Sequence, residues 1–232
     1  MSSSPLVVLQ GEFAVEQSLS SLAGAHILKT PRPLSCIVVA MYNRAKGVGA
    51  LAHIDDYTDA ANTIEKICNF AKDKFEAPCS GEYNAFIMGG TSDPFSVQNK
   101  DLITQVLHSL NIKTKIKPLS EDISIRPQIT LDVQNGKLRL LKDDQIDQKL
   151  EYLQRREYGE FNRWLDAAYA GVNGADIPYF EGKLALRHER DIPEFKANTA
   201  QELEQTRRKD QLGQIKLPLR PQRKAISNRD EL

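Results

Sequence analysis

The chain has 232 residues, of which 41% are hydrophobic and 27% charged, and its 31 basic and 31 acidic residues leave no net charge. These values are those of an ordinary globular protein, and they exclude collagen-like, wholly disordered and disulfide-rich chains. No apolar run approaches the roughly 20 residues of a membrane-spanning helix, and the N-terminal segment lacks the regions of a signal peptide. The three cysteines form no CxxC motif. We therefore expect free thiols, a reducing compartment and a cytoplasmic location.

The first predicted elements are strands. Two short apolar runs, over residues 6–10 and 13–15, flank a turn that contains a glycine. Residues 36–42 are rich in β-branched and other apolar side chains, a composition that is typical of a strand. Residues 44–47 are turn-like and residues 48–54 form a second predicted strand, so a hairpin is expected here.

Helices and strands then follow each other up to residue 141. Thr58 can cap a helix whose apolar positions recur with helical spacing. The other predicted elements are a strand over residues 83–88, a helix after Asp93, and strands over residues 112–117, 129–133 and 137–141. Asn135-Gly136 joins the last two strands, and this dipeptide tolerates the positive φ angles of a tight hairpin turn. Because this order lacks regular βαβ alternation, the predicted fold class is mixed α+β.

The chain is predicted to have three parts. Residues 1–142 carry the sheet and helices just described, and residues 143–175 form a helical appendage. Residues 176–232 form a loosely ordered basic extension, because the apolar periodicity is lost there. Its last part, residues 206–232, has eight Lys or Arg against three Asp or Glu, so its net charge is +5. A solvated tail is the commoner role for such a segment, and binding of an acidic partner is the functional alternative.

A cysteine and a histidine are candidate catalytic residues. Cys36 begins a predicted strand after a proline-stiffened approach, and His53 lies near the end of the next strand. If the hairpin turn is centred near residues 44–45, Cys36 lies opposite His53, and the imidazole can take the proton of the thiol. The alternative is that Cys36 is a small buried hydrophobic residue, which is the common state of a free cysteine.

Other kinds of site have less support. His53, Asp55 and Asp56 could offer metal ligands, but no HxH, HxxxH or HExxH spacing occurs, and we predict neither a metal nor a cofactor. The glycine pairs at residues 47–49 and 89–90 are not nucleotide-binding fingerprints. We also expect no nucleic acid as partner.

Four segments resemble the protein N-terminal asparagine amidohydrolase family. They are LQGEFAV at residues 9–15, SCIVV at 35–39, AHID at 52–55 and GGTSD at 89–93. The interval of 17 residues from Cys36 to His53 is similar to that of the bacterial chemoreceptor glutamine deamidases (CheD-like), whose threonine six residues before the cysteine corresponds to Thr30. The deamidase domain of the cytotoxic necrotizing factor toxins is a more distant relative. The resemblance implies an α+β sandwich of this type over about residues 5–140.

The resemblance also implies a cysteine-dependent amidase with Cys36 as nucleophile and His53 as base. Thr30 would orient the histidine ring, because an imidazole needs one nitrogen held to keep the useful tautomer. The α-ammonium group of an N-terminal asparagine needs an anionic partner. Asp55 is the first candidate for it, followed by Glu12 and Asp56.

The predicted function is hydrolysis of a side-chain carboxamide, most directly conversion of an N-terminal asparagine of a protein or peptide to aspartate. The reaction would pass through a thioester and release ammonia. Two alternatives remain open at this point. One is a glutamine deamidase that acts on a specific folded protein, with the appendage and the basic tail as docking elements. The other is a catalytically silent binding module with the same fold.

Overall fold

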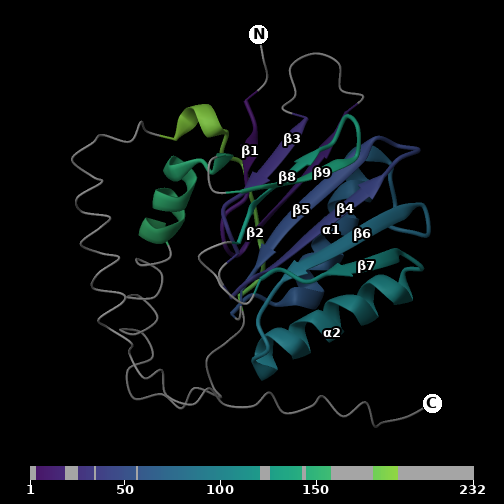
Figure 1. Ribbon diagram of the computed structural model, residues 1–232. Coiled ribbons are helices and arrows are strands. Elements are labelled where there is room, and N and C mark those ends of the chain that lie inside the picture. Colours follow the sequence, from purple (N-terminus) through teal and green to yellow (C-terminus); the bar gives the residue numbers. More distant parts are fainter. Residues whose placement is uncertain are drawn as a thin grey trace. The chain divides into compact units, whose positions relative to one another are not determined.

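Two mixed β-sheets and a layer of helices make up the part of the chain that the structure describes (Figure 1). This computed structural model describes residues 4–18, 26–33, 35–55, 57–120, 126–142, 145–157 and 180–192. The chain divides into two compact units, and all of these residues belong to the first, Met1–Tyr158 with Tyr179–Glu194. The second unit lies outside the described residues. The predicted α+β class is therefore confirmed in its mixed sheets and helices.

The larger sheet has six strands, and most of them come from the first half of the chain. Their spatial order is β10 (Lys183–Leu184), β2 (Glu12–Gln17), β5 (Val48–Ile54), β4 (Ile37–Asn43), β6 (Tyr83–Gly89) and β7 (Lys113–Lys117). The four inner strands are antiparallel to each other, whereas β10 is parallel to β2 and β7 is parallel to β6. The predicted β4–β5 hairpin is thus present at the centre of this sheet.

The smaller sheet has four strands. Their order is β1 (Leu6–Val7), β3 (Ile27–Thr30), β8 (Gln128–Asp132) and β9 (Lys137–Leu141). The predicted β8–β9 hairpin is present, but its loop has four residues, 133–136, and of the Asn135-Gly136 pair only Gly136 has a positive φ, at 61°. Strand β1 is parallel to β3 and is much shorter than the run expected from the sequence.

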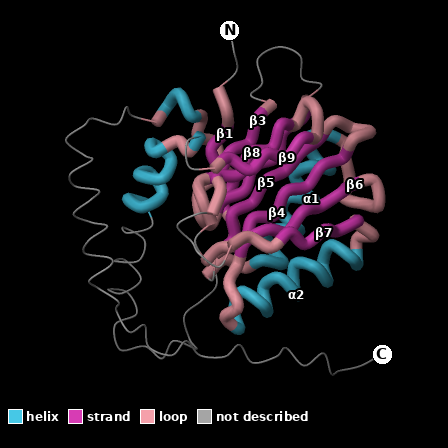
Figure 2. Tube along the Cα trace, viewed as in Figure 1, coloured by secondary structure: helices cyan, strands magenta, loops and turns pink. Residues whose placement is uncertain are grey.

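The six-stranded sheet separates two apolar cores, and alternate residues of β4 face opposite ways. Val38 and Ala40 pack against the smaller sheet, while Ile37 and Val39 pack against the helices. Helices α1 (Ala60–Phe75) and α2 (Pro94–Ser109) lie on the side of the large sheet opposite β8 and β9 (Figure 2). The described part of the first unit is therefore layered as helices, large sheet and small sheet.

The start of α1 differs by one residue from the prediction. Asp59, rather than Thr58, is the N-cap, and its side chain accepts a hydrogen bond from Asn62 N at 3.1 Å. Thr58 does not cap the helix because its hydroxyl donates to the Asp55 carboxylate at 2.6 Å. None of the helices in the described part of the chain is both long enough and apolar enough to cross a membrane.

Two segments beyond residue 142 belong to the same compact unit as the sheets. Residues 148–157 are helical, and Leu150 and Leu153 pack with Val7 and Leu9 of the N-terminal strand region. The segment that contains β10 returns to pair with β2. The boundary expected at residue 142 is therefore not a boundary between compact units. The remaining appendage and the basic tail, over residues 158–179 and 193–232, lie outside the described residues.

The cysteines depart from the expectation of free thiols. Cys68 of α1 and Cys79 in the loop after it form a disulfide. Cys36 is not part of this bond. The prediction was wrong because Cys79 folds back onto the helix, a contact that spacing in the sequence does not reveal, and the argument from cysteines for a reducing compartment falls with it.

Candidate active site

The centre of the candidate site is a hydrogen bond between the two sheets. Thr30 is the last residue of β3 in the small sheet, and His53 lies near the end of β5 in the large sheet. Thr30 Oγ1 is 2.7 Å from His53 Nδ1, and both residues are fully buried. The structure thus brings these two predicted site residues together, although they come from different sheets.

Burial determines the charge of His53. Desolvation lowers the pKa of the imidazole to about 3, so the ring is neutral at physiological pH. If Nδ1–H donates to Thr30 Oγ1, the other nitrogen, Nε2, carries the lone pair that can accept a proton. Among the described residues none forms a hydrogen bond with Nε2, although this atom is buried. The arrangement can therefore supply a neutral base with one nitrogen held in place.

The register of the β4–β5 hairpin differs from the prediction. Val38, and not Cys36, lies opposite His53, and Ile37 lies opposite Ile54. The difference is two residues, because the loop has four residues, 44–47, and is centred between residues 45 and 46. Continuing the register by one residue puts Cys36 opposite the residue after Ile54, on the same face as Val38 and His53. In this extrapolated register Cys36 would be a diagonal neighbour of His53, a relation that spans about 7–8 Å between Cα atoms in antiparallel sheets.

Two glycines let another strand approach the backbone of Cys36. Gly90 N donates to Cys36 O at 2.8 Å. A Cβ atom on Gly89 would lie 2.6 Å from the same oxygen, which is closer than real Cβ atoms come to a carbonyl. Both glycines have positive φ, 81° and 72°. The GGTSD segment therefore holds the chain at Cys36 through its backbone.

Replacing Gly89 by alanine is expected to destabilise the fold more than replacing Gly90 by alanine. Both changes place a side chain in the left-handed region, at a cost of about 1–2 kcal/mol each. The new methyl group at Gly89 also meets the backbone of Cys36, whereas at Gly90 it meets mainly the flexible stem of Lys100. Urea unfolding of the two variants measures the difference, which we expect to be about 1 kcal/mol or more. Equal losses would contradict the close approach.

Arg126 is a site residue that the sequence did not single out. It is fully buried, and its guanidinium donates to three backbone carbonyls: Pro33 O at 3.0 Å, Gly90 O at 2.9 Å and Ser120 O at 2.7 Å. Pro33 lies three residues before Cys36, and Gly90 is the glycine whose N donates to Cys36 O. Arginine is almost never fully buried without partners, so nothing in the sequence could indicate this role.

Asp55 has a structural role in the described residues. Its Oδ1 accepts from Tyr57 N at 3.0 Å and from the Thr58 hydroxyl, and its Oδ2 accepts from Gln10 Nε2 at 3.1 Å. A carboxylate that already has three donors is a poor choice for a substrate ammonium group. Asp56, the third candidate, lies outside the described residues.

Glu12 is the second candidate for the partner of the substrate ammonium group. It is directly opposite His53 on the neighbouring strand β2, so its Cβ is on the same face of the sheet. Its Oε2 accepts from Leu9 N at 2.9 Å. Burial raises the pKa of the Glu12 carboxyl, and the positive charges of Arg187 and Lys183 counteract part of that rise. Among the described residues, no three His, Cys, Asp or Glu side chains are grouped as metal ligands.

One protein family matches residues 2–126, more than half of the chain. The family is that of protein N-terminal asparagine amidohydrolases, and the chain belongs to it. The expected similarity to the glutamine deamidases stays a prediction.

Similarity to other characterised or solved proteins is low. No curated protein matches the chain. The hypothetical protein YfiH of Bacillus licheniformis is 14% identical with a TM-score of 0.31, over 42% of this chain and 52% of that chain. A Neisseria meningitidis protein of the DUF152 type is 10% identical with a TM-score of 0.34, over 52% and 65%. The chain therefore spans about half of the first solved protein and somewhat more of the second.

Proposed function

We propose that the chain hydrolyses the side-chain amide of an N-terminal asparagine with Cys36 as nucleophile and His53 as general base. The proposal rests on the protonation state of the His53 ring and on its hydrogen bond to Thr30. The ring is neutral and held at Nδ1 by Thr30, and the residue opposite His53, Val38, lies two residues after Cys36. A positioned base next to a thiol is the requirement for activating a cysteine.

The reaction follows from these roles. Nε2 of His53 takes the proton of the Cys36 thiol as the sulfur attacks the side-chain carbonyl carbon of the asparagine. Backbone N–H groups at Cys36 stabilise the oxyanion of the tetrahedral intermediate. The imidazolium then gives the proton to the leaving nitrogen, and ammonia departs from a thioester. His53 next removes a proton from water, which attacks the thioester and releases aspartate and the free thiol.

Burial of His53 makes the timing of proton transfer important. An imidazolium with no counter-charge is disfavoured in this site, since the pKa of His53 is lowered to about 3. The resting imidazole is therefore neutral. Positive charge on the ring develops together with negative charge on the sulfur or on the oxyanion, so each stabilises the other.

Glu12 is the proposed partner of the substrate α-ammonium group. It is half-buried and directly opposite His53, while the Asp55 carboxylate is engaged by its own chain. An ammonium group bound there would be next to the base, as a terminal asparagine requires. This assignment favours an N-terminal amidase over a glutamine deamidase, whose internal substrate residue has no free α-amino group.

Intact-mass analysis of four peptides tests the proposed function. The peptides begin with asparagine, with glutamine, or with N-acetylated asparagine, and the fourth has an internal glutamine. We expect deamidation of the free N-terminal asparagine alone. Equal turnover of free and acetylated peptides would overturn the N-terminal amidase, and turnover of the internal glutamine would favour the alternative.

Replacing Glu12 by glutamine is expected to weaken substrate recognition, because an ion pair in a partly dry site is worth about 2–5 kcal/mol. The KM for the free peptide should rise, and acetylation of the peptide should add little to this loss, since both changes remove the same interaction. Glu16→Gln is the matched control. Glu16 is on the same strand and face, and burial also raises the pKa of its carboxyl, but it lies opposite Gly49. An unchanged KM in Glu12→Gln would exclude Glu12 as the ammonium partner.

A further inference from the structure

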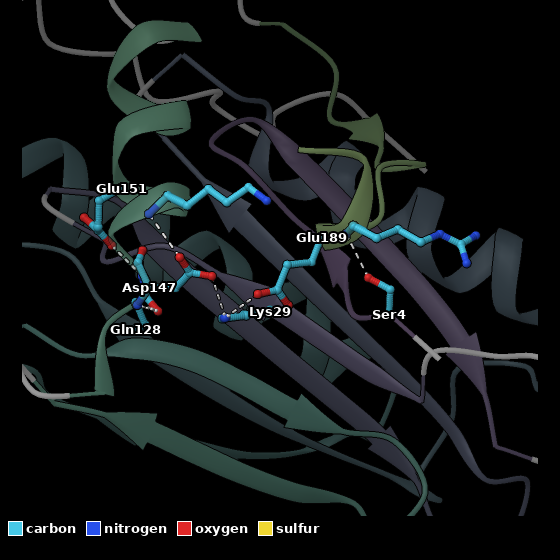
Figure 3. Close-up of polar contacts among 8 residues, drawn as sticks. Ser4, Lys29, Gln128, Asp147, Glu151 and Glu189 are labelled. Atoms are coloured by element: carbon cyan, nitrogen blue, oxygen red, sulfur yellow. Dashed lines mark hydrogen bonds and ion pairs between the residues drawn. The ribbon is translucent and has the colours of Figure 1, made fainter. Parts of the chain in front are cut away.

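The strand that carries Thr30 is held by carboxylates from the part of the chain beyond residue 142. Lys29 Nζ is 3.1 Å from a carboxylate oxygen of Asp147 and 3.1 Å from one of Glu189. Figure 3 shows Lys29 between these two side chains. Arg32 is bound by Glu151, through its backbone N at 2.9 Å and its Nε at 3.2 Å. Lys29 and Arg32, the cationic residues on either side of Thr30, are therefore both paired with carboxylates beyond residue 142.

Glu151 also reaches the strand next to Thr30. Its side chain is almost fully buried, at 7% exposure, and its Oε1 accepts from Gln128 Nε2 at 3.1 Å. Gln128 begins β8, whose Ile129 pairs with Thr30. The amide of Gln128 also donates to Asp147 O at 2.9 Å and accepts from Asp147 N at 3.0 Å (Figure 3). The start of the helix over residues 148–157 is thus fixed to the strand beside Thr30.

A second contact from the same helix leads, through Gln10, to Asp55, which lies two residues after His53. Gln154 lies three residues after Glu151 and is also buried, so both share one face of the helix. Gln154 Oε1 accepts from Gln10 N at 3.2 Å, and Gln154 Nε2 donates to Gln10 Oε1 at 3.3 Å. Gln10 Nε2 in turn donates to Asp55 Oδ2. One helix face therefore connects to both sides of the Thr30–His53 pair.

We propose that the helix over residues 148–157 is a positioning element of the active site. Glu151 acts through Arg32 on Thr30, and Gln154 acts through Gln10 and Asp55 on the strand end that carries His53. Together they hold the two sheets at the separation that the 2.7 Å contact between Thr30 Oγ1 and His53 Nδ1 requires. The helix lies outside residues 2–126, which match the amidohydrolase family. The effect on turnover rests on the proposed function, whereas the effect on the imidazole does not.

Two variants of the full chain test this role. Glu151→Gln keeps the shape of the side chain but puts an amide group, which is itself a donor, against the donors of Arg32. Gln154→Ala removes the contact with Gln10. It provides a second test if the Glu151→Gln variant does not fold. The matched control is Glu181→Gln, which breaks an ion pair of 2.6 Å with Lys66 of α1. That pair also joins the later segment to the core, but it is exposed and lies on another element.

The first readout is the ¹⁵N NMR spectrum of the histidine rings, which reports the tautomer and the hydrogen bond at Nδ1. The chain has four histidines, so a His53→Asn spectrum assigns the His53 signals. We expect Glu151→Gln and Gln154→Ala to shift the His53 ring signals and Glu181→Gln to leave them unchanged. Folded variants whose His53 signals match the wild type would overturn the proposal.

The second readout is the kinetics with a peptide that begins with asparagine. We expect kcat to fall about tenfold or more in Glu151→Gln with little change in KM, because a small misplacement of the base acts on the chemical step. The control should keep both constants. A wild-type protein without turnover would refute the proposed function only, since the NMR result still decides whether the helix positions His53.

Discussion

Replacing Cys36 by alanine is expected to abolish the release of ammonia from a peptide that begins with asparagine. No other group in the proposed site can form the thioester, so the loss should be complete rather than partial. Cys36 is buried at 3% exposure, and removing one sulfur atom should cost about 1 kcal/mol of stability, which a folded domain tolerates. A coupled ammonia assay together with thermal unfolding separates the two effects.

The other two cysteines provide the control for this experiment. Replacing both Cys68 and Cys79 by serine removes the disulfide on the helix side of the large sheet. This double variant should keep its turnover, with a lower melting temperature. Ammonia release by Cys36→Ala above the uncatalysed background would exclude Cys36 as the nucleophile.

Replacing His53 by asparagine is expected to lower kcat/KM by about 10²–10⁴-fold, the usual contribution of a general base. Asparagine places a polar group near the position of Nδ1, so the contact with Thr30 can be kept while Nε2 is lost. Thr30→Ala removes the contact and keeps the base, and we expect a smaller loss from it. A His53→Asn variant with wild-type turnover would exclude the imidazole as base.

The same variant should change how stability depends on pH. The pKa of His53 is about 3 in the folded protein and 6.5 in the unfolded chain, so the unfolded chain binds more protons between these values. The stability contributed by a neutral His53 is therefore present above pH 6.5 and is lost as the pH falls, by at most about 1.4 kcal/mol per unit. Urea unfolding at pH 6, 5 and 4 should show a smaller decrease for His53→Asn than for the wild type. Parallel curves would contradict the burial of a neutral ring.

The elements that sequence predicted well are those whose local chemistry decides the conformation. Asn135-Gly136 determines the β8–β9 turn, and the apolar periodicity of α1 and α2 determines which face they bury. The β4–β5 hairpin was predicted as well, but its register was wrong by two residues. A four-residue loop without a strong turn signal does not determine its own centre, so Cys36 was placed opposite the wrong partner.

Residues of the site that depend on tertiary contacts could not be predicted in this way. Glu151 and Gln154 are buried polar residues, and in a periodic pattern a polar residue is assigned to the solvent side. Asp55 was assigned to the substrate because it follows His53. Its position shortly before a Thr-Asp pair and a helix was a signal for the turn that it closes. Thr30 came from the family resemblance, since nothing in its own neighbourhood indicates a partner across two sheets.

The edges of both sheets are completed by residues that are synthesised late. Val7 N donates to Arg187 O at 2.9 Å, and Leu6 forms an isolated bridge with His188, while β10 extends the large sheet beside β2. Strands near the start of the chain therefore wait for partners roughly 180 residues downstream, which at about 5–20 residues per second takes the ribosome roughly 10–40 s. During that time β1 and β2 each have an edge without its final neighbour. A nascent chain thus exposes these two edges until most of its translation is complete.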